Sequence, residues 1–360
     1  MISKIGWKDF FIRIPKIKMK KENMIPQAVF LAVFFMLSFF IVYCEERPDY
    51  FVYERIYNGV YPDHEWGYMF LNNLFWNMGF RFQQFLAVIS FFALLFTLRF
   101  LYFSCYAKLL ILVTYLWFPF FSDGVQIRSL LANTILYISF GYLFQKGKKG
   151  VCQYILCVFL AGSMHYYALI YIILLAAKVP FHKRQLLGSC MILSVTGIFL
   201  FKYTGFVPVI IEKIFGTGKV LKNFQFETGI GFVIPAAVQF IQFWLFLQAY
   251  GWNKKIQGQD NGMAKIIPMM KQSSADILLR ANIWMMLALF PLYVFNVAFF
   301  RVYRCMHIVN IIFIFNTLYV KRKGKLLLTK NSIFLLFYIL LAGVANGSIG
   351  IIRVWIAGIM

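Results

Sequence analysis

The chain has 360 residues, of which 61% are hydrophobic and 14% are charged, and its mean hydropathy is +0.73. Soluble domains contain roughly 45 to 50% apolar residues, so a water-soluble fold could not bury this sequence in one core. The formal charge of +23 would suit nucleic acid, but Lys and Arg gather in short gaps between apolar runs, as topology signals do. The composition therefore excludes a soluble domain, argues against a nucleic-acid partner, and predicts an all-α polytopic integral membrane protein.

Residues 1–24 form a basic, amphipathic segment ahead of the first apolar run. Aromatic residues such as Trp7 and Phe11 lie among Lys4, Lys8 and Arg13. This pattern fits a helix that lies on an anionic inner leaflet, and no small-residue cleavage site follows it. We predict a cytoplasmic N-terminal segment at 1–24 and one transmembrane domain at 25–360.

Apolar runs recur along the whole chain at lengths near the 20 or so residues that cross a bilayer. They predict membrane-crossing helices near 25–43, 82–98, 101–121, 126–144, 187–203, 230–250, 281–299, 305–320 and 332–345. Gly and Asn interrupt the last stretch, 343–360, which could be one broken helix or a helix with a short return. With the half-crossing arms described next, we expect about eleven or twelve transmembrane or half-crossing helices.

The stretch 151–178 is flanked by Lys residues at both ends, which places both flanks in the cytoplasm. The segment must then go out and come back, leaving each arm about 14 residues, or about 21 Å at 1.5 Å per residue. That length is short of the roughly 30 Å of hydrocarbon. We predict a re-entrant hairpin whose turn, from Gly162 to His165, stops below the outer surface.

Charge sets the orientation of the chain. With a cytoplasmic N-terminus, 25 of the 36 Lys and Arg residues fall on the cytoplasmic side, together with only 4 of the 13 acidic residues. The excess of Lys and Arg is the part of this asymmetry that carries orientation. We therefore predict that the loop 44–81, which holds six of the 13 acids, is extracytoplasmic and lies along the membrane surface.

This loop supplies the first candidate site residues. Asp49 and Glu65 are candidate catalytic acids or bases, and Tyr50, Tyr53 and Tyr57 recur beside them at helical spacing. Aromatic faces next to carboxylates suit the binding of sugar rings. The alternative is an interfacial aromatic belt with solvated acids.

Three arginines and a histidine add to the same face. Arg128, close to Asp123 and Gln126, begins the fourth span, and Arg301 and Arg304 lie near the outer end of a later one. A guanidinium can bind phosphate through two parallel hydrogen bonds, or it can simply reach lipid headgroups. His165, in the predicted turn, is a candidate catalytic residue or a structural side chain.

Motifs for several other chemistries are missing from the sequence. It contains no P-loop, HExxH, GxSxG or dinucleotide-binding glycine pattern, and no DxD-like acid pair for a metal-bound nucleotide sugar. These absences argue against nucleotide-driven pumps, membrane zinc proteases and metal-dependent nucleotide-sugar transferases. We expect no metal and no cofactor.

Four short motifs resemble the EpsG-like group of Wzy-type polysaccharide polymerases. They are Asp49-Tyr50 with Tyr53, Glu65-Trp66-Gly67-Tyr68, Ile127-Arg128 with Leu131-Ala132, and Met164-His165 with Ala168-Leu169. In order and spacing they cover residues 25–180. The chain departs from the family pattern at Ser129, where Gln is usual, and at Met164 and Tyr167, where Phe and a small residue are usual.

The resemblance implies a bacterial plasma-membrane glycosyltransferase that joins undecaprenyl-diphosphate-linked repeat units of a capsular or exopolysaccharide at the outer face. Its implied partners are the lipid-linked oligosaccharide, membrane lipids, and flippase and chain-length regulator proteins. Outer arginines would bind the diphosphate, and a carboxylate or imidazole would act as the base for the acceptor hydroxyl. Two alternatives stay open: a lipid-linked oligosaccharide flippase or other transporter, and a membrane acyltransferase that modifies the polysaccharide.

Overall fold

The structure is a computed structural model, and it describes residues 24–45, 49–60, 65–180, 229–258, 267–321 and 330–345, together with isolated positions 189 and 196. The predicted N-terminal amphipathic segment, the predicted span at 187–203 and the C-terminal stretch beyond 345 lie outside these ranges.

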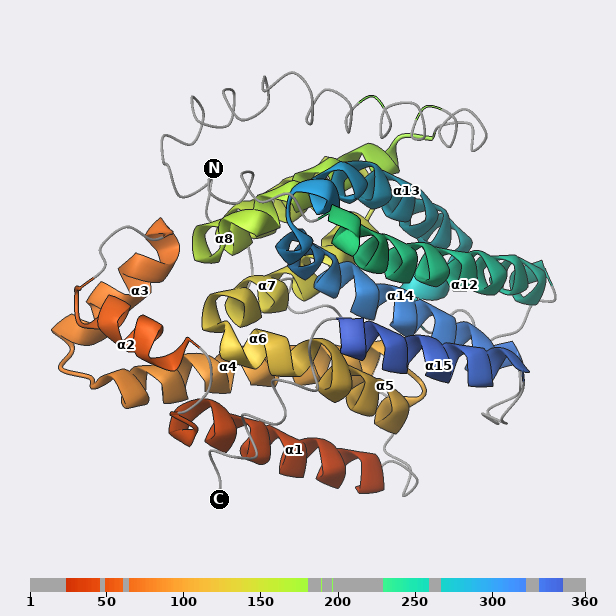
Figure 1. The fold of residues 1–360 in the computed structure, drawn as a ribbon. Helices are drawn as coiled ribbons and strands as arrows, with labels where there is room; N and C mark the ends of the chain where they lie inside the picture. The colour runs from red at the N-terminus through yellow and green to blue at the C-terminus, as the bar shows by residue number, and fades with distance from the viewer. Residues whose placement is uncertain are drawn as a thin grey trace.

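All regular structure in these ranges is helical (Figure 1). The first half contains α1 (Met24–Tyr43), α2 (Tyr50–Tyr57), α3 (Trp66–Asn77), α4 (Phe82–Ser104), α5 (Lys108–Tyr115), η3 (Leu116–Phe120), α6 (Phe121–Val125), α7 (Ile127–Leu143), α8 (Gly147–Met164) and η4 (Tyr166–Lys178). The second half contains η5 (Gly229–Phe232), α12 (Val233–Gly258), η7 (Pro268–Met270), α13 (Gln272–Phe295), η8 (Val297–Phe299), α14 (Phe300–Lys321) and α15 (Lys330–Ala345).

Six helices within the described ranges are long and apolar enough to cross a membrane. They are Ile25–Tyr43, Phe82–Ser104, Lys108–Val125, Val233–Gly258, Gln272–Val294 and Phe300–Lys321. Tyr166–Lys178 and Phe334–Val344 are shorter apolar helices. The predicted fold class is confirmed: the chain is an all-α, multi-pass membrane protein.

Several helix boundaries differ from the sequence prediction. Lys108–Val125 begins seven residues later than the predicted span at 101–121, because the chain leaves the helical conformation at Cys105. α13 begins at Gln272 rather than 281, and α14 at Phe300 rather than 305. These shifts place Arg301 and Arg304 in the first turns of α14 instead of in a loop.

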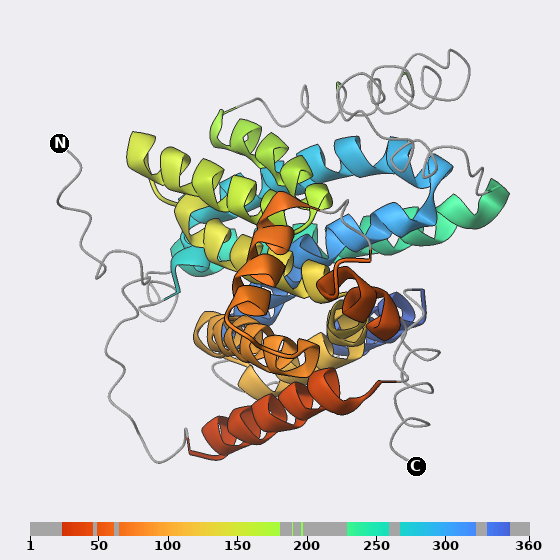
Figure 2. The same ribbon diagram turned by 90° about the vertical axis from the view of Figure 1, so that its left-hand side faces the viewer.

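Two short helices lie at one end of the helix bundle. Figure 1 shows α2 and α3 at the left-hand end of the molecule, beside the start of α4, and Figure 2 looks onto this end, with α3 in front of the bundle. Their 8 and 12 residues are too few to cross a bilayer. That the segment lies along the membrane surface stays a prediction.

The predicted hairpin is present, although its depth and orientation stay predictions. α8 ends at Met164, His165 adopts an extended conformation with φ −155° and ψ 122°, and η4 then runs back to Lys178. At the other end of the hairpin, the Lys178 ammonium donates a hydrogen bond of 2.7 Å to the carbonyl of Gln145. The turn is tight because Gly162 carries no side chain: a Cβ there would lie 2.3 Å from the Leu169 side chain.

Candidate functional site

The site begins where α3 packs against the end of α8. A Cβ on Gly67 would lie 2.2 Å from Ser163 Oγ and 2.9 Å from the Ser163 carbonyl oxygen, so only glycine allows this approach. Ser163 is two residues before His165, and Gly67 is two residues after Glu65. The close helix contact therefore brings Glu65 and His165, which are 100 residues apart, to the same place.

The Glu65 carboxylate contacts two predicted site residues at once. Its Oε2 forms an ion pair and a hydrogen bond with Nη1 of Arg128, the second residue of α7. Its Oε1 lies 3.0 Å from Nδ1 of His165 and accepts a 3.4 Å hydrogen bond from the Tyr166 amide. The Glu65 side chain is 4% exposed, whereas those of Arg128 and His165 are 20% and 24% exposed. A buried acid thus holds a cation and an imidazole that both reach the surface.

The environment of Glu65 decides its charge. Burial alone would raise the pKa of this carboxyl, but the hydrogen bond with His165 and the positive charge of Arg128 outweigh it and lower the pKa to about 2. Glu65 is therefore a carboxylate at neutral pH and a weak base. We refer to Glu65, Arg128 and His165 as the acid–arginine–histidine cluster.

The three tyrosines predicted to bind sugar occupy different positions. Tyr50 and Tyr57 are 2% and 4% exposed and pack their rings against Phe82. The Tyr57 hydroxyl donates a 2.8 Å hydrogen bond to the carbonyl of Phe80. Only Tyr53 contacts the cluster: its hydroxyl accepts a 3.5 Å hydrogen bond from Arg128 Nε, and the guanidinium lies 5.5 Å from its ring centre.

Asp49 and Arg301 lie at the edge of the cluster. Asp49 is exposed at the start of α2, in a left-handed conformation with φ 69°. Arg301, in the first turn of α14, interacts electrostatically with Asp49, Tyr53 and His165. Residues from the second half of the chain therefore approach the cluster formed by the first.

Arg304 does not share the exposed position of Arg301. It is 3% exposed, and its Nη1 donates a 2.9 Å hydrogen bond to Oδ1 of Asp123, which is fully buried. From the sequence, Asp123 is a neighbour of Arg128 with no predicted role. The signal was an acid inside an apolar stretch, because such acids are rarely kept in a membrane without a partner.

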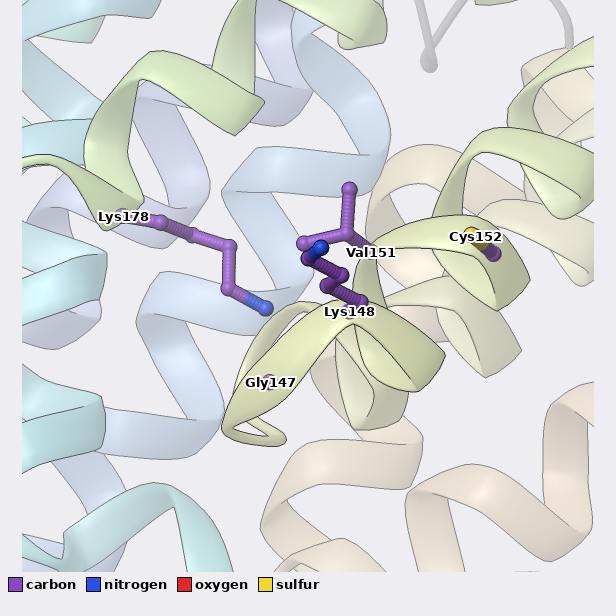
Figure 3. A pocket seen from close by; sticks show the side chains of 5 residues that line it. All are labelled: Gly147, Lys148, Val151, Cys152 and Lys178. Carbon is purple, nitrogen blue, oxygen red and sulfur yellow. The ribbon is translucent and has the colours of Figure 1, made fainter.

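A hollow of about 430 Å³ lies elsewhere on the molecule. It is lined by Gly147, Lys148, Val151, Cys152 and Lys178 (Figure 3). These residues belong to the end of the hairpin opposite His165. The hollow is therefore separate from the cluster. Within the described ranges, no group of three or more His, Cys, Asp and Glu side chains could hold a metal ion.

The cluster combines three chemical capacities in one partly exposed position. Arg128 can stabilise anionic oxygen together with the neighbouring Arg301, the imidazole of His165 can accept a proton, and the Glu65 carboxylate can orient Arg128 and His165.

The comparison with family models identifies the family of the chain. The EpsG family model matches residues 27–351, which include every member of the cluster and both halves of the described structure. No curated protein and no solved structure matches the chain. The chain belongs to the EpsG family.

Proposed function

We propose that the protein is a polysaccharide polymerase that joins polyprenyl-diphosphate-linked repeat units at the outer face of the bacterial plasma membrane. Membership of the EpsG family supports a Wzy-like membrane enzyme of polysaccharide synthesis. The observation that carries the proposal is the contact of Glu65 with both Arg128 and His165.

The reaction requires one bond to form and one to break. The acceptor hydroxyl oxygen attacks the anomeric carbon of the donor glycan, and the bond from that carbon to the diphosphate oxygen breaks. The hydroxyl proton goes to a base, and the leaving diphosphate takes the electron pair. The leaving group carries concentrated negative charge, so fixed cations in a poorly hydrated site lower the barrier.

The residues of the cluster and the neighbouring Arg301 fit these demands. Arg128 and Arg301 bind the departing diphosphate, and Glu65 fixes the orientation of the Arg128 guanidinium. Glu65 also holds Nδ1 of His165, which keeps Nε2 as the proton acceptor for the hydroxyl. Because the pKa of Glu65 is about 2, His165 is the better base of the two, and Asp49 is the alternative.

Purified protein incubated with a diphospholipid-linked repeat unit tests the proposal directly. We expect a ladder of products that lengthens with time, in the presence or absence of a metal chelator. A lipid-linked oligosaccharide flippase is the second candidate, and it would relocate the substrate in vesicles without new glycosidic bonds. Transfer of an acyl group to the glycan would instead identify an acyltransferase.

Cysteine labelling tests the outer location of the cluster. Asn58, beside α2, and Cys152, near the start of α8, are both exposed. The test uses two proteins with a single cysteine each: Asn58→Cys without any native cysteine, and a protein that keeps only Cys152. We expect the cysteine at position 58 to react with an impermeant thiol reagent in intact cells. Cys152 alone should react only after permeabilisation. The reverse pattern would place the cluster in the cytoplasm and contradict the proposal.

A further inference from the structure

A buried ion pair lies behind the acid–arginine–histidine cluster. Arg304 and Asp123 are 3% and 0% exposed, and their facing atoms are 2.9 Å apart. Removing two charges from water is costly, and an apolar pair would stabilise a membrane domain at least as well. Stability alone therefore does not account for the pair.

The pair is connected to His165 through two polar side chains. Asn133, in α7, donates a 2.9 Å hydrogen bond to Oδ2 of Asp123. The Tyr167 hydroxyl donates a 2.8 Å hydrogen bond to Oδ1 of Asn133. The Tyr167 ring then lies against the His165 imidazole, with ring centres 4.6 Å apart.

The same pair also reaches Arg301. Residues 301 and 304 are three positions apart at the start of α14 and so lie on one side of the helix. The Arg304–Asp123 pair joins the first turns of α14 to α6, and Tyr171 of the hairpin donates a 2.6 Å hydrogen bond to the carbonyl of Val302 in the same turns. Asp123 therefore connects to His165 through Asn133 and Tyr167, and to Arg301 through Arg304.

We infer that Asp123, Arg304, Asn133 and Tyr167 form a positioning network that holds the His165 imidazole and the Arg301 guanidinium in register with Glu65 and Arg128. The inference rests on the proposed function, because turnover in its tests is measured as polymer formation. It replaces the sequence prediction that Arg304 binds diphosphate, because the Arg304 guanidinium is buried against Asp123.

The first test removes a single oxygen. Tyr167→Phe keeps the ring beside His165 but loses the hydrogen bond to Asn133. Tyr154→Phe is the matched control, because that tyrosine lies in the same hairpin, is 0% exposed and donates a 2.7 Å hydrogen bond to the Tyr171 carbonyl. We expect Tyr167→Phe to lower kcat about tenfold at an unchanged donor KM, as small misplacement of a reacting group does. The control should keep kcat near wild type, with a similar loss of thermal stability.

A second readout does not depend on catalysis. The rate at which diethyl pyrocarbonate modifies His165, followed by peptide mass spectrometry, should rise in Tyr167→Phe and not in Tyr154→Phe, because an imidazole held less firmly is more accessible. If the wild-type protein makes no polymer but this difference appears, the network stands and the polymerase proposal fails. Normal polymerisation with equal kcat and equal modification rates in both variants would overturn the network.

A neutral double variant tests the ion pair. Asp123→Asn with Arg304→Gln removes both charges and leaves no buried charge unpaired, so the domain should fold. We expect the double variant to lose turnover about tenfold while donor KM stays near wild type. A rise in donor KM at unchanged kcat would show instead that Arg304 binds the diphosphate directly.

Discussion

Two of the polar clusters among the described residues differ in charge and in access to the surface. The acid–arginine–histidine cluster contains an acid, a cation and an imidazole, and two of its three side chains are partly exposed. A second cluster connects α12, α13, α14 and α15. Its side chains are 2% exposed or less and carry no carboxylate or guanidinium: Gln242, Asn282, Tyr303, His307, Asn310 and Tyr338.

The members of this amide cluster form hydrogen bonds with one another. Asn282 and Asn310 exchange two hydrogen bonds, of 2.9 Å and 2.6 Å. Gln242 accepts a hydrogen bond from the Tyr303 hydroxyl and donates one of 3.0 Å to the His307 carbonyl. The His307 Nδ1 atom lies 3.0 Å from the Tyr338 hydroxyl.

The contrast separates two uses of polar side chains in a membrane. Reciprocal hydrogen bonds between neutral groups hold helices together where no water can reach, so the amide cluster suits packing. Placing charged side chains in a membrane domain costs more free energy than helix packing alone would justify. Charged groups that reach the surface are therefore suited to chemistry on an anionic substrate. Substitutions should therefore reduce activity in the first cluster and stability in the second.

The largest effect is expected at Arg128. Lysine keeps the positive charge but cannot bind Glu65 and a diphosphate with a planar fork, so Arg128→Lys should lose most turnover while remaining folded. Arg128→Ala should lower turnover by about a thousandfold, the upper range for removal of one group that stabilises developing negative charge. Initial rates of polymer formation at matched protein levels measure both variants. Wild-type turnover in Arg128→Ala would remove the arginine from the proposed mechanism.

The sequence alone identified the charged cluster better than the neutral one. Arg128, Glu65 and His165 are ionisable residues in or beside apolar runs, so each was visible as an exception to its surroundings. The Asn and Gln residues of α12 to α14 also interrupt apolar runs, but the sequence does not show which of them face one another. The sequence prediction places the helix starts at 272 and 300 too late, because Ser, Asp and Arg there resemble loop residues, although Ser274 and Arg304 are buried in the fold.

The second effect concerns the pH dependence of stability. The pKa of Glu65 falls from 4.5 to about 2 in the folded protein, so its carboxylate stabilises the fold by on the order of 3 kcal/mol. This contribution is complete above the unfolded pKa, near 4.5, and is lost as pH falls through about 2. Glu65→Gln should therefore melt below wild type at pH 7, with the gap narrowing below about pH 4.5. Thermal unfolding in detergent at several pH values measures the gap, and a constant gap would show that Glu65 is not held by its partners.

A smaller effect on activity is expected at Gly67. The Cβ of Gly67→Ala would collide with Ser163 and push α3 away from α8, which separates Glu65 from His165. A displacement near 1 Å at a reacting group can lower rates about a hundredfold, so we expect a loss of 10-fold to 100-fold. Adding Ser163→Gly removes the two closest atoms and should restore part of the rate. Absence of any rescue would show that the loss does not come from this contact.

The smallest effect is expected in the amide cluster, where it should appear as stability. Asn282→Leu leaves the amide of Asn310 without its reciprocal partner in a site closed to water, which costs about 1 to 3 kcal/mol. Asn282→Leu with Asn310→Leu removes both amides and fills the space with apolar atoms, so the double variant should recover most of that loss. Unfolding midpoints in detergent report these changes, and turnover per folded molecule should stay near wild type in both variants. A large loss of turnover at normal stability would make the amide cluster part of the functional site and end the division between the two regions.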